Sequence, residues 1–557
     1  GTINAWTPYA YDWRLPLQRT LAEGSEQFDS STQLKLVDEI ERLANDSKSG
    51  KVTIVAHSMG GLLGKLLIQK LEAEGKAHLI ESFVMVGTPQ LGTPQAAATL
   101  LHGHQTLAMD LFSRSHVTRA IGQDMETAYS LLPSERYFSE VVDPVLKFSE
   151  SAAFTEVWRN RWGATTDTYG EFSEFMTGTG VLRVSPEPTN LAIPEVVRSD
   201  LLSNADALHD LLDSYVFPAH IRVVQIAGWG LPTLKGLEYK NKHLVFQGYE
   251  ADFTVEGDQT VVYPSAVSSN TSEKYYFNLP AYNALPDTSN HEHRNLIGAG
   301  PIQTLVSSII TNEAVQNEYI SVQKPDPGNL EDQLLVSTKS PVILGAYDMS
   351  GNFTGINPNQ DLTAETLPIE EGIPESTFIA SGEDFYLFLP KSGKYDFVFK
   401  GTGTGPATLE VGTFSNDAVI PEVSYTDIPV TPSTTADFVI DTAVVDTVFI
   451  EIDSNGDGQG DSVVAPDGYV PPPTLSELIA SLKATIESLD IKEKLREKLL
   501  KRVEKIEKKI AKQKSEKASQ VIMNLEKKVI KKTEKGRISS ADAEAILNLL
   551  EQIEGEL

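Results

Sequence analysis

The spacing of apolar residues near the start of the chain alternates between two periods. Residues 51–56 (KVTIVA) and 82–86 (SFVMV) are short apolar runs rich in β-branched side chains, which are typical of buried strands. At 32–48 and 60–71, apolar residues instead recur every three or four positions, which predicts helices. This helix–strand–helix–strand order predicts a parallel sheet covered on both faces, and therefore an α/β fold.

The sheet pattern resumes after a long interruption. From about 95 to 218 the pattern is mostly helical, and the apolar run at 221–227 then returns to the strand type. We therefore expect a helical cap inserted into the sheet. Further strand-like runs occur at 253–255 and 260–263. Together these segments predict a first domain over residues 1–324.

Two proline-containing stretches divide the rest of the chain. KPDPG at 324–328 precedes a region rich in Thr, Val, Gly and Pro with short alternating runs, which predicts a β-sandwich over 330–466. Three prolines at 471–473 precede a Lys- and Glu-rich segment with helical spacing of apolar residues. This last segment predicts a small three-helix bundle over 474–557.

The sequence AHSMGG at 56–61 lies where the first predicted strand passes into a helix. This is the setting of a nucleophile elbow, a sharp turn with small flanking residues that presents a serine at the N-terminus of a helix. Ser58 is therefore the candidate nucleophile, and the backbone N–H of Met59 is a candidate oxyanion donor. The alternative is a serine that only caps the helix. His57 is adjacent in sequence, but on such a turn we expect it to point away.

A serine nucleophile needs a base and a carboxylate that orients the base, and in this fold the acid and then the histidine follow the serine along the chain. Asp258 lies at a turn between strand-like runs, and Asp252 is the nearest rival. His291 and His293 follow in a polar loop. Order and proximity support both histidines, and spacing alone does not choose between them.

Six short motifs follow one another along the first 300 residues. They are YDWR at 11–14, AHSMGG at 56–61, GTP at 87–89 with Gly92, LLPS at 131–134, GDQTV at 257–261 and HRNL at 293–296. In this order they resemble the lecithin:cholesterol acyltransferase and phospholipid:diacylglycerol acyltransferase family of α/β-hydrolases, including its bacterial lipase-like members. The resemblance covers roughly residues 5–315. It implies Ser58 as nucleophile, Asp258 as orienting acid and His293 as base.

The family resemblance also implies a reaction. The expected activity is hydrolysis of a lipid or other carboxylic ester through an acyl-serine intermediate, or transfer of the acyl group to an alcohol, with no cofactor needed for catalysis. In the family, strands and an oxyanion loop precede the YDWR motif, whereas here ten residues do so. We therefore expect an N-terminally incomplete chain, with the second oxyanion donor and a signal peptide encoded upstream.

The two C-terminal regions carry weaker resemblances. The β-rich region resembles sandwich modules appended to secreted bacterial hydrolases, and the helical tail resembles the bundles called FIMAH at the ends of bacterial surface proteins. Both imply a bacterial extracellular or cell-surface protein, with a cell-surface or cell-wall partner for these modules. The alternative function is a cell-surface binding or adhesion protein whose hydrolase domain is a relic.

Charge and cysteine content exclude several kinds of chemistry. The net charge is −30. Residues 474–557 hold 19 basic and 15 acidic residues, so their net charge is +4 and that of the remaining chain is −34. The acidic part of the chain before residue 474 would repel phosphates, which argues against a nucleic-acid partner. The chain has no cysteine, which excludes disulfides, thiolate metal sites and a cysteine nucleophile.

The sequence DSNGDGQGD at 453–461 places oxygen-bearing side chains on alternate residues with a glycine at the sixth position, as at the start of a calcium loop. Position twelve is Val464 rather than glutamate, so a complete EF-hand is not expected. The candidate ligands of a structural calcium ion are Asp453, Asn455, Asp457 and Asp461. Because this set is incomplete, the alternative is a solvated acidic turn.

Overall fold

The computed structural model divides the chain into two compact units, Gly1–Asp467 and Gly468–Leu557. It describes residues 5–27, 33–104, 111–113, 115–141, 143–179, 183–242, 246–268, 273–285, 289–314, 317–339, 341–362, 364, 366–445, 448–469 and 473–557. The first two prolines of the second predicted linker lie outside these residues. Within the described residues, no helix combines the length and the apolarity needed to span a bilayer.

The first unit contains the predicted parallel sheet. Its strand order is β11-β10-β7-β4-β3, in which β3 (Val52–His57), β4 (Ile80–Val86), β7 (Arg222–Trp229) and β10 (Glu273–Asn278) run parallel. The short β11 (Ile320–Ser321) pairs antiparallel with β10. Among the described residues, β3 forms one edge of this sheet. The α/β fold class predicted from the sequence is therefore confirmed.

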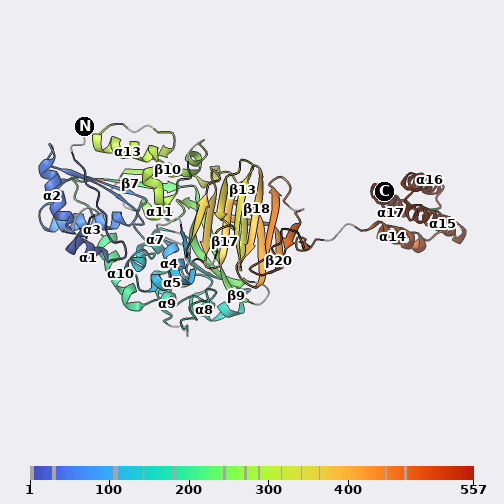
Figure 1. The fold of residues 1–557 in the computed structure, drawn as a ribbon, viewed down its shortest axis with the longest axis horizontal. Helices are drawn as coiled ribbons and strands as arrows, with labels where there is room; N and C mark the ends of the chain where they lie inside the picture. Colours follow the sequence, from blue (N-terminus) through green and yellow to red (C-terminus); the bar gives the residue numbers. More distant parts are fainter. Residues whose placement is uncertain are drawn as a thin grey trace. The chain divides into compact units, whose positions relative to one another are not determined.

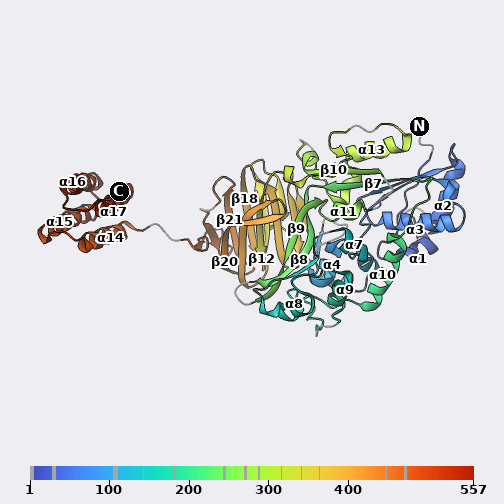
Figure 2. The same cartoon turned by 180° about the vertical axis from the view of Figure 1, so that it is seen from behind.

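Helices cover both faces of this sheet (Figures 1 and 2). On one face, α2 (Leu36–Asp46) and α3 (Gly60–Ala73) share a core with Met85. On the other, α13 (Gly300–Thr311) shares a core with Val84. Because neighbouring residues of a strand point to opposite faces, a continuous apolar strand is needed wherever both faces are buried. This explains the apolar run of β4, whereas on the edge strand β3, which the sequence predicted to be buried, the side chain of Val55 is 37% exposed.

The predicted cap is mostly helical. Its helices are α4 (Pro94–His102), α5 (Ser115–Gln123), α6 (Glu126–Ser130), α7 (Glu135–Glu140), α8 (Glu156–Trp162), α9 (Tyr169–Thr177) and α10 (Ser199–Asp213), with short strands β5 (Leu111–Ser113) and β6 (Leu146–Phe148). The remaining small elements of this unit are α1 (Leu17–Glu23), β1 (Ser25–Glu26), β2 (Gln33–Leu34), α11 (Tyr263–Ala266) and α12 (Leu279–Asn283). The long hairpin β8 (Leu231–Lys242) and β9 (Phe246–Gly257) pairs with β6 to form a separate sheet.

One strand prediction is wrong. Residues 260–263 do not form a strand but a turn that leads into α11. The side chain of Asp258 causes this, because its Oδ1 accepts the backbone N–H groups of Thr260 and Val261 at 3.2 and 2.8 Å. A carboxylate that binds the N–H groups two and three residues on competes with strand pairing. The strand that extends the sheet beyond β7 is instead β10, which the sequence reading missed.

The β-rich region forms the predicted sandwich of two sheets. Their strand orders are β16-β17-β12-β19-β20 and β23-β22-β21-β18-β13-β14-β15-β5. The strands are β12 (Gln333–Lys339), β13 (Val342–Asp348), β14 (Phe353–Ile356), β15 (Thr366–Glu371), β16 (Thr377–Ser381), β17 (Asp384–Pro390), β18 (Lys394–Gly401), β19 (Gly405–Ser415), β20 (Ala418–Val430), β21 (Thr435–Asp441), β22 (Ile450–Asp453) and β23 (Ser462–Val464).

The sandwich is continuous with the part of the chain before residue 324, which holds the α/β sheet and the cap and is called the hydrolase part below, although the linker at 324–328 predicts a separate module. Strand β5 of the cap pairs antiparallel with β15 and so extends a sandwich sheet. The ring of Phe253 on β9 packs against Tyr386 and Phe388 of β17, with centroids 5.0 and 5.3 Å apart. Asp417 accepts the backbone N–H of Val255 at 2.7 Å. The two parts therefore share a core within one compact unit.

The second unit contains four helices among its described residues, where the sequence predicted three. They are α14 (Leu475–Ser488), α15 (Glu493–Ile510), α16 (Ser515–Thr533) and α17 (Ser540–Gly555). The break before α16 lies at Gln513, whose φ of +50° turns the chain without a glycine or proline. The sequence reading missed this break because glycine and proline are the usual signals of a helix end. Apolar residues of all four helices form one core.

Candidate active site

Ser58 lies on a sharp turn between β3 and α3. Its φ is +52°, a left-handed conformation that is uncommon for any residue other than glycine. Its backbone N–H donates to the carbonyl oxygen of Val86 at 2.9 Å, which ties the turn to the next strand. A Cβ at Gly61 would lie 2.0 Å from Oγ1 of Thr88, so the first turn of the helix needs a glycine there. The local geometry is that of the predicted nucleophile elbow.

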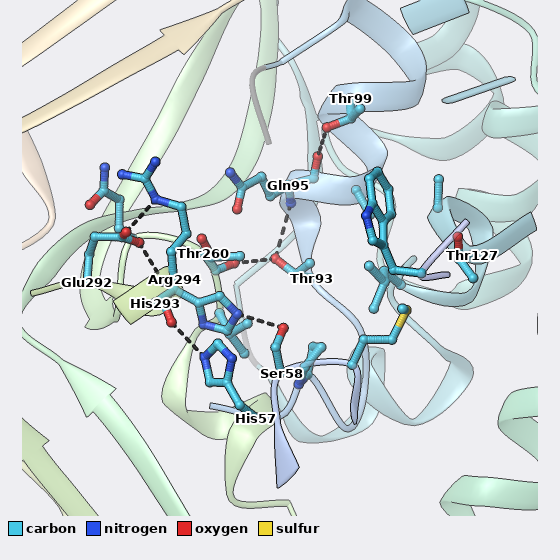
Figure 3. A pocket seen from close by; sticks show the side chains of 18 of the residues that line it. His57, Ser58, Thr93, Gln95, Thr99, Thr127, Thr260, Glu292, His293 and Arg294 are labelled. Carbon is cyan, nitrogen blue, oxygen red and sulfur yellow. Dashed lines mark hydrogen bonds and ion pairs between the residues drawn. The ribbon is translucent and has the colours of Figure 1, made fainter. Parts of the chain in front are cut away.

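The structure brings together Ser58, His293 and Asp258. Nε2 of His293 lies 2.8 Å from Oγ of Ser58 (Figure 3). On the other side of the ring, Nδ1 lies 2.8 Å from Oδ2 of Asp258. Asp258 and His293 are 1% and 5% exposed. The backbone N–H of His293 also donates to the carbonyl oxygen of Asp258 at 2.9 Å. The three side chains thus form a hydrogen-bonded chain that ends at a serine in the pocket.

Electrostatics favour the role of His293 as a base. Burial lowers the pKa of this imidazole, but the charge and the hydrogen bond of Asp258 outweigh burial and raise the pKa above its usual value. A neutral imidazole that donates Nδ1–H to Asp258 has an acceptor at Nε2, facing the hydroxyl of Ser58. This arrangement can take a proton from the serine and hold it beside a carboxylate.

The rival candidates lie elsewhere. Nδ1 of His291 lies 2.8 Å from the carbonyl oxygen of Ser289. Asp252 forms an ion pair with Lys147 at 2.5 Å on the β6-β8-β9 sheet. The structure therefore brings neither rival to Ser58.

His57 lies beside the site in a supporting position. Its Nε2 lies 2.7 Å from the carbonyl oxygen of His293, and the two rings are 5.1 Å apart. Burial, followed by the neighbouring His293, lowers the pKa of His57 to about 4, which keeps the ring neutral. A neutral His57 that donates to this carbonyl holds the backbone of His293 in place.

Ser58 opens into a cavity of about 510 Å³, within the range of pockets that bind small molecules. Tyr11 and Trp13 of the YDWR motif and Leu131 of the LLPS motif line it. Met59, which follows Ser58 at the start of α3, also lines the cavity. All six motifs that were recognised in the sequence therefore contribute residues to the cavity around Ser58.

The sandwich supplies a further wall of the same cavity. The contributing residues lie on β15 and β16 and are Ile369, Glu371, Phe378, Ile379 and Ala380. No local signal in the sequence points to them, because they lie more than 300 positions after Ser58 in a region that resembles an appended module. The cavity is therefore closed by two parts of the chain that sequence reading treated as separate domains.

The loops that carry Asp258 and His293 are also bonded to the sandwich. Gln259, next to Asp258, donates to Oε1 of Glu371 at 3.2 Å. Asn290, three residues before His293, donates to the carbonyl oxygens of Glu371 and Ile373 at 3.0 and 2.8 Å. Asn290 also accepts the N–H of Glu375 at 3.0 Å. These contacts fix both loops against one edge of the sandwich.

No metal site is evident among the described residues, in which no three His, Cys, Asp or Glu side chains are grouped to hold an ion. In the predicted calcium loop, Asp453 accepts the backbone N–H groups of Gly456 and Gly458 at 2.6 and 2.7 Å. Asp461 accepts the N–H of Ser454 at 2.9 Å. The carboxylates are folded onto the loop backbone as in a turn, and calcium binding stays a prediction.

Part of the chain that holds this site is similar to a known protein family. Residues 3–270 match the family model described as lecithin:cholesterol acyltransferase. Among solved structures, the chain is similar to one in the Tle4–Tli4 complex, with 16% identity and a TM-score of 0.31. The similarity covers 51% of this chain and 64% of that chain, so this chain spans less than two thirds of the length of that one. It is also similar to the Bacillus licheniformis lipase BlEst2 in its propeptide form, with 11% identity and a TM-score of 0.26 over 72% of this chain and 82% of that one. These two similarities are too distant to assign an activity, and no curated protein matches the chain.

Proposed function

Because residues 3–270 belong to the lecithin:cholesterol acyltransferase family, we propose that this chain is a serine-dependent enzyme that cleaves lipid esters through an acyl-serine intermediate. The observation that carries the proposal is the hydrogen-bonded chain from Ser58 through His293 to Asp258, with both side-chain distances at 2.8 Å. His293 lies beyond the matched segment, so its assignment as the base rests on this geometry.

In the first half of the reaction, Oγ of Ser58 attacks the carbonyl carbon of the ester while its proton passes to Nε2 of His293. The backbone N–H of Met59, at the N-terminus of α3, stabilises the oxyanion that forms. The bond from the carbonyl carbon to the alcohol oxygen then breaks, and His293 returns the proton to that oxygen. Asp258 stays ionised and orients the imidazole throughout.

In the second half, a water or an alcohol gives its proton to His293 and attacks the acyl-serine. The carbon–Oγ bond breaks, and Ser58 recovers its proton from His293. Water as the acceptor gives hydrolysis, whereas an alcohol gives acyl transfer. We propose hydrolysis as the basal reaction, since the cavity opens to solvent, with transfer when an acceptor alcohol occupies it. The ratio of free fatty acid to new ester in the presence of a long-chain alcohol measures this choice.

The direct test uses p-nitrophenyl acyl esters with the wild-type protein and its variants. Ser58→Ala should abolish turnover, and a fluorophosphonate should label Ser58 alone. His293→Ala should cost about as much, because members of a triad act as a unit. His291→Ala is the matched control and should cost little. Labelling of another serine, or a larger loss at His291 than at His293, would contradict the assignment.

The pH profile gives a second test. The base must be neutral to act, and Asp258 raises the pKa of His293, so kcat/KM should fall as the pH drops through a midpoint above that of an ordinary histidine. Asp258→Asn removes the charge that raises this pKa. The midpoint should therefore move to lower pH, while the maximal rate falls by about 10⁴-fold, as in other triads. An unchanged midpoint would show that another group governs the profile.

We also propose that the helical bundle binds an anionic polymer of the cell surface, which would place the enzyme outside a bacterial cell. Several cationic side chains lie close together on α15 and α16. Burial, followed by the charges of Arg502, Lys498 and Lys532, lowers the pKa of Lys528. Cations that lower one another's pKa are stabilised by bound negative charge. Residues 468–557 should bind an anionic polysaccharide with an affinity that falls with salt, and Lys528→Gln with Lys532→Gln should weaken it. Equal binding to neutral dextran would contradict this.

A further inference from the structure

The cavity around Ser58 has two unlike sides. Figure 3 shows Glu292 and Arg294 on one side of Ser58 and Thr127 on the other. Thr127 belongs to α6, and its neighbours Met125, Ala128 and Leu131, which also line the cavity, are apolar. An acyl chain fits the apolar side, because burying its methylene groups there removes them from water. The charged side is then left for the alcohol part of the ester.

Glu371 of β15 brings the sandwich into the charged side. Its Oε1 accepts the backbone N–H of Phe378 at 2.8 Å and the side chain of Gln259 at 3.2 Å. Its Oε2 lies 3.7 Å from the guanidinium of Arg294, which is beyond hydrogen-bond distance. One oxygen is therefore fixed by two donors, and the other retains the capacity to bind a donor from a substrate.

The charges on this side select against ionic alcohols. Nε of Arg294 lies 2.5 Å from Glu292, so one cation stands between two carboxyl groups. Burial, and then the charge of Glu292, raise the pKa of Glu371 to about 7. A phosphate would be repelled by these carboxyl groups, and an ammonium headgroup would meet the charge of Arg294. A hydroxyl group avoids both penalties and bonds to Glu371 in either of its protonation states.

We propose that Glu371, with Arg294 and Gln259, binds the hydroxyl groups of an uncharged polyol, so that the preferred substrate is a partial fatty-acid ester of a polyol such as a monoacylglycerol. The subsite rests on the proposed function, since the polyol is the alcohol released when Ser58 is acylated. In this assignment the sandwich determines specificity, because it carries Glu371 into a cavity whose nucleophile lies in the hydrolase part.

The test compares three esters of one fatty acid: a 1-monoacylglycerol, an ethyl ester and a lysophosphatidylcholine. It uses the wild-type protein and its variants. The wild type should have its highest kcat/KM with the monoacylglycerol. Glu371→Gln should lower the ratio of kcat/KM for monoacylglycerol to that for ethyl ester about tenfold, chiefly through KM, because a substrate hydroxyl loses a charge-assisted partner. Glu370→Gln is the matched control, since Glu370 is the exposed neighbour on the same strand, and the ratio should not change.

Arg294→Gln is the second variant and should lower the same ratio. Equal losses with both esters in Glu371→Gln would make Glu371 structural and overturn the subsite, as would an unchanged ratio. A wild-type preference for the lysophospholipid would also overturn it. A wild type that cleaved none of the three esters would instead contradict the proposed function itself, so the two failures are distinguishable.

Discussion

The sandwich and the helical bundle both follow proline-containing stretches, yet they relate to the catalytic part in opposite ways. The sandwich lies in the same compact unit as the hydrolase part, shares its core, and lines the cavity of Ser58. The bundle forms a unit of its own, and its core is built from residues 478–553 alone. A linker-like sequence therefore says where a chain passes between modules, but not whether the modules fold independently.

The difference arises from the faces that the two regions expose. The bundle turns its apolar residues inward among four helices and presents lysines and glutamates outside. The sandwich has a second apolar surface, with Leu335, Ile379, Tyr386, Phe388 and Phe414 packed among residues of the hydrolase core. An apolar surface of this kind needs a partner, and the hairpin β8–β9 supplies one.

The largest expected effect comes from deleting the sandwich, and deleting the bundle alone is the matched comparison. Ending the chain after residue 467 should leave ester turnover unchanged, because the unit Gly1–Asp467, called the catalytic unit below, is intact. Ending it after residue 324 should remove a wall of the cavity and the supports of both triad loops, and should lower kcat/KM on the order of 100-fold or more. Turnover of p-nitrophenyl esters by the purified proteins measures both. Full activity without the sandwich would contradict the comparison.

Substitutions that leave a large cavity in one core or the other should show whether the two regions unfold separately in an otherwise unchanged chain. Phe388 and Leu525 are both fully buried, the first in the shared core and the second in the bundle. Phe388→Ala should destabilise the catalytic unit by about 3–5 kcal/mol, and Leu525→Ala should destabilise the bundle by about 2–5 kcal/mol. Calorimetry should show that each change lowers a different transition.

The temperature at which activity is lost distinguishes these two variants further. It should fall in Phe388→Ala and stay at the wild-type value in Leu525→Ala. A fall in both would mean that the bundle and the catalytic unit unfold together.

A smaller effect is expected where the sandwich holds the loop of the base. Asn290→Ala removes hydrogen bonds to Glu371, Ile373 and Glu375. Each is worth about 0.5–1.5 kcal/mol, so a loss of about tenfold in kcat is expected as the loop of His293 loosens. Asn359→Ala, an exposed change on the sandwich, is the matched control and should leave kcat unchanged. Equal kcat in both variants would show that the loop is held by other contacts.

The smallest effect concerns calcium. If the loop at 453–461 binds the ion, millimolar calcium should raise the melting temperature of the catalytic unit by roughly 2–4 °C and leave the bundle transition in place. Asp453→Asn should remove this shift, and magnesium should not reproduce it. An absent shift would make the loop a solvated acidic turn.

Much of the site could be predicted because its signals are local. Ser58 was found from a strand, a small-residue turn and a helix that are contiguous in sequence, and the same elements form the observed elbow. The family resemblance indicated Asp258 as the acid and His293 as the base, and the structure brings both residues to the site of Ser58. Residues 260–263 were predicted as a strand because their sequence does not show that Asp258 binds the backbone N–H groups of Thr260 and Val261. These hydrogen bonds are what hold the segment in a turn.

The sequence by itself determined the alternation of strands and helices, the position of the candidate nucleophile and the existence of three regions, since each depends on residues a few positions apart. Only the tertiary structure decided that Glu371 and Asn290 meet beside the triad, because these residues are 81 positions apart and more than 230 positions from Ser58. Their meeting depends on how two apolar surfaces fit against each other, and that fit is a property of packed side chains rather than of any local pattern.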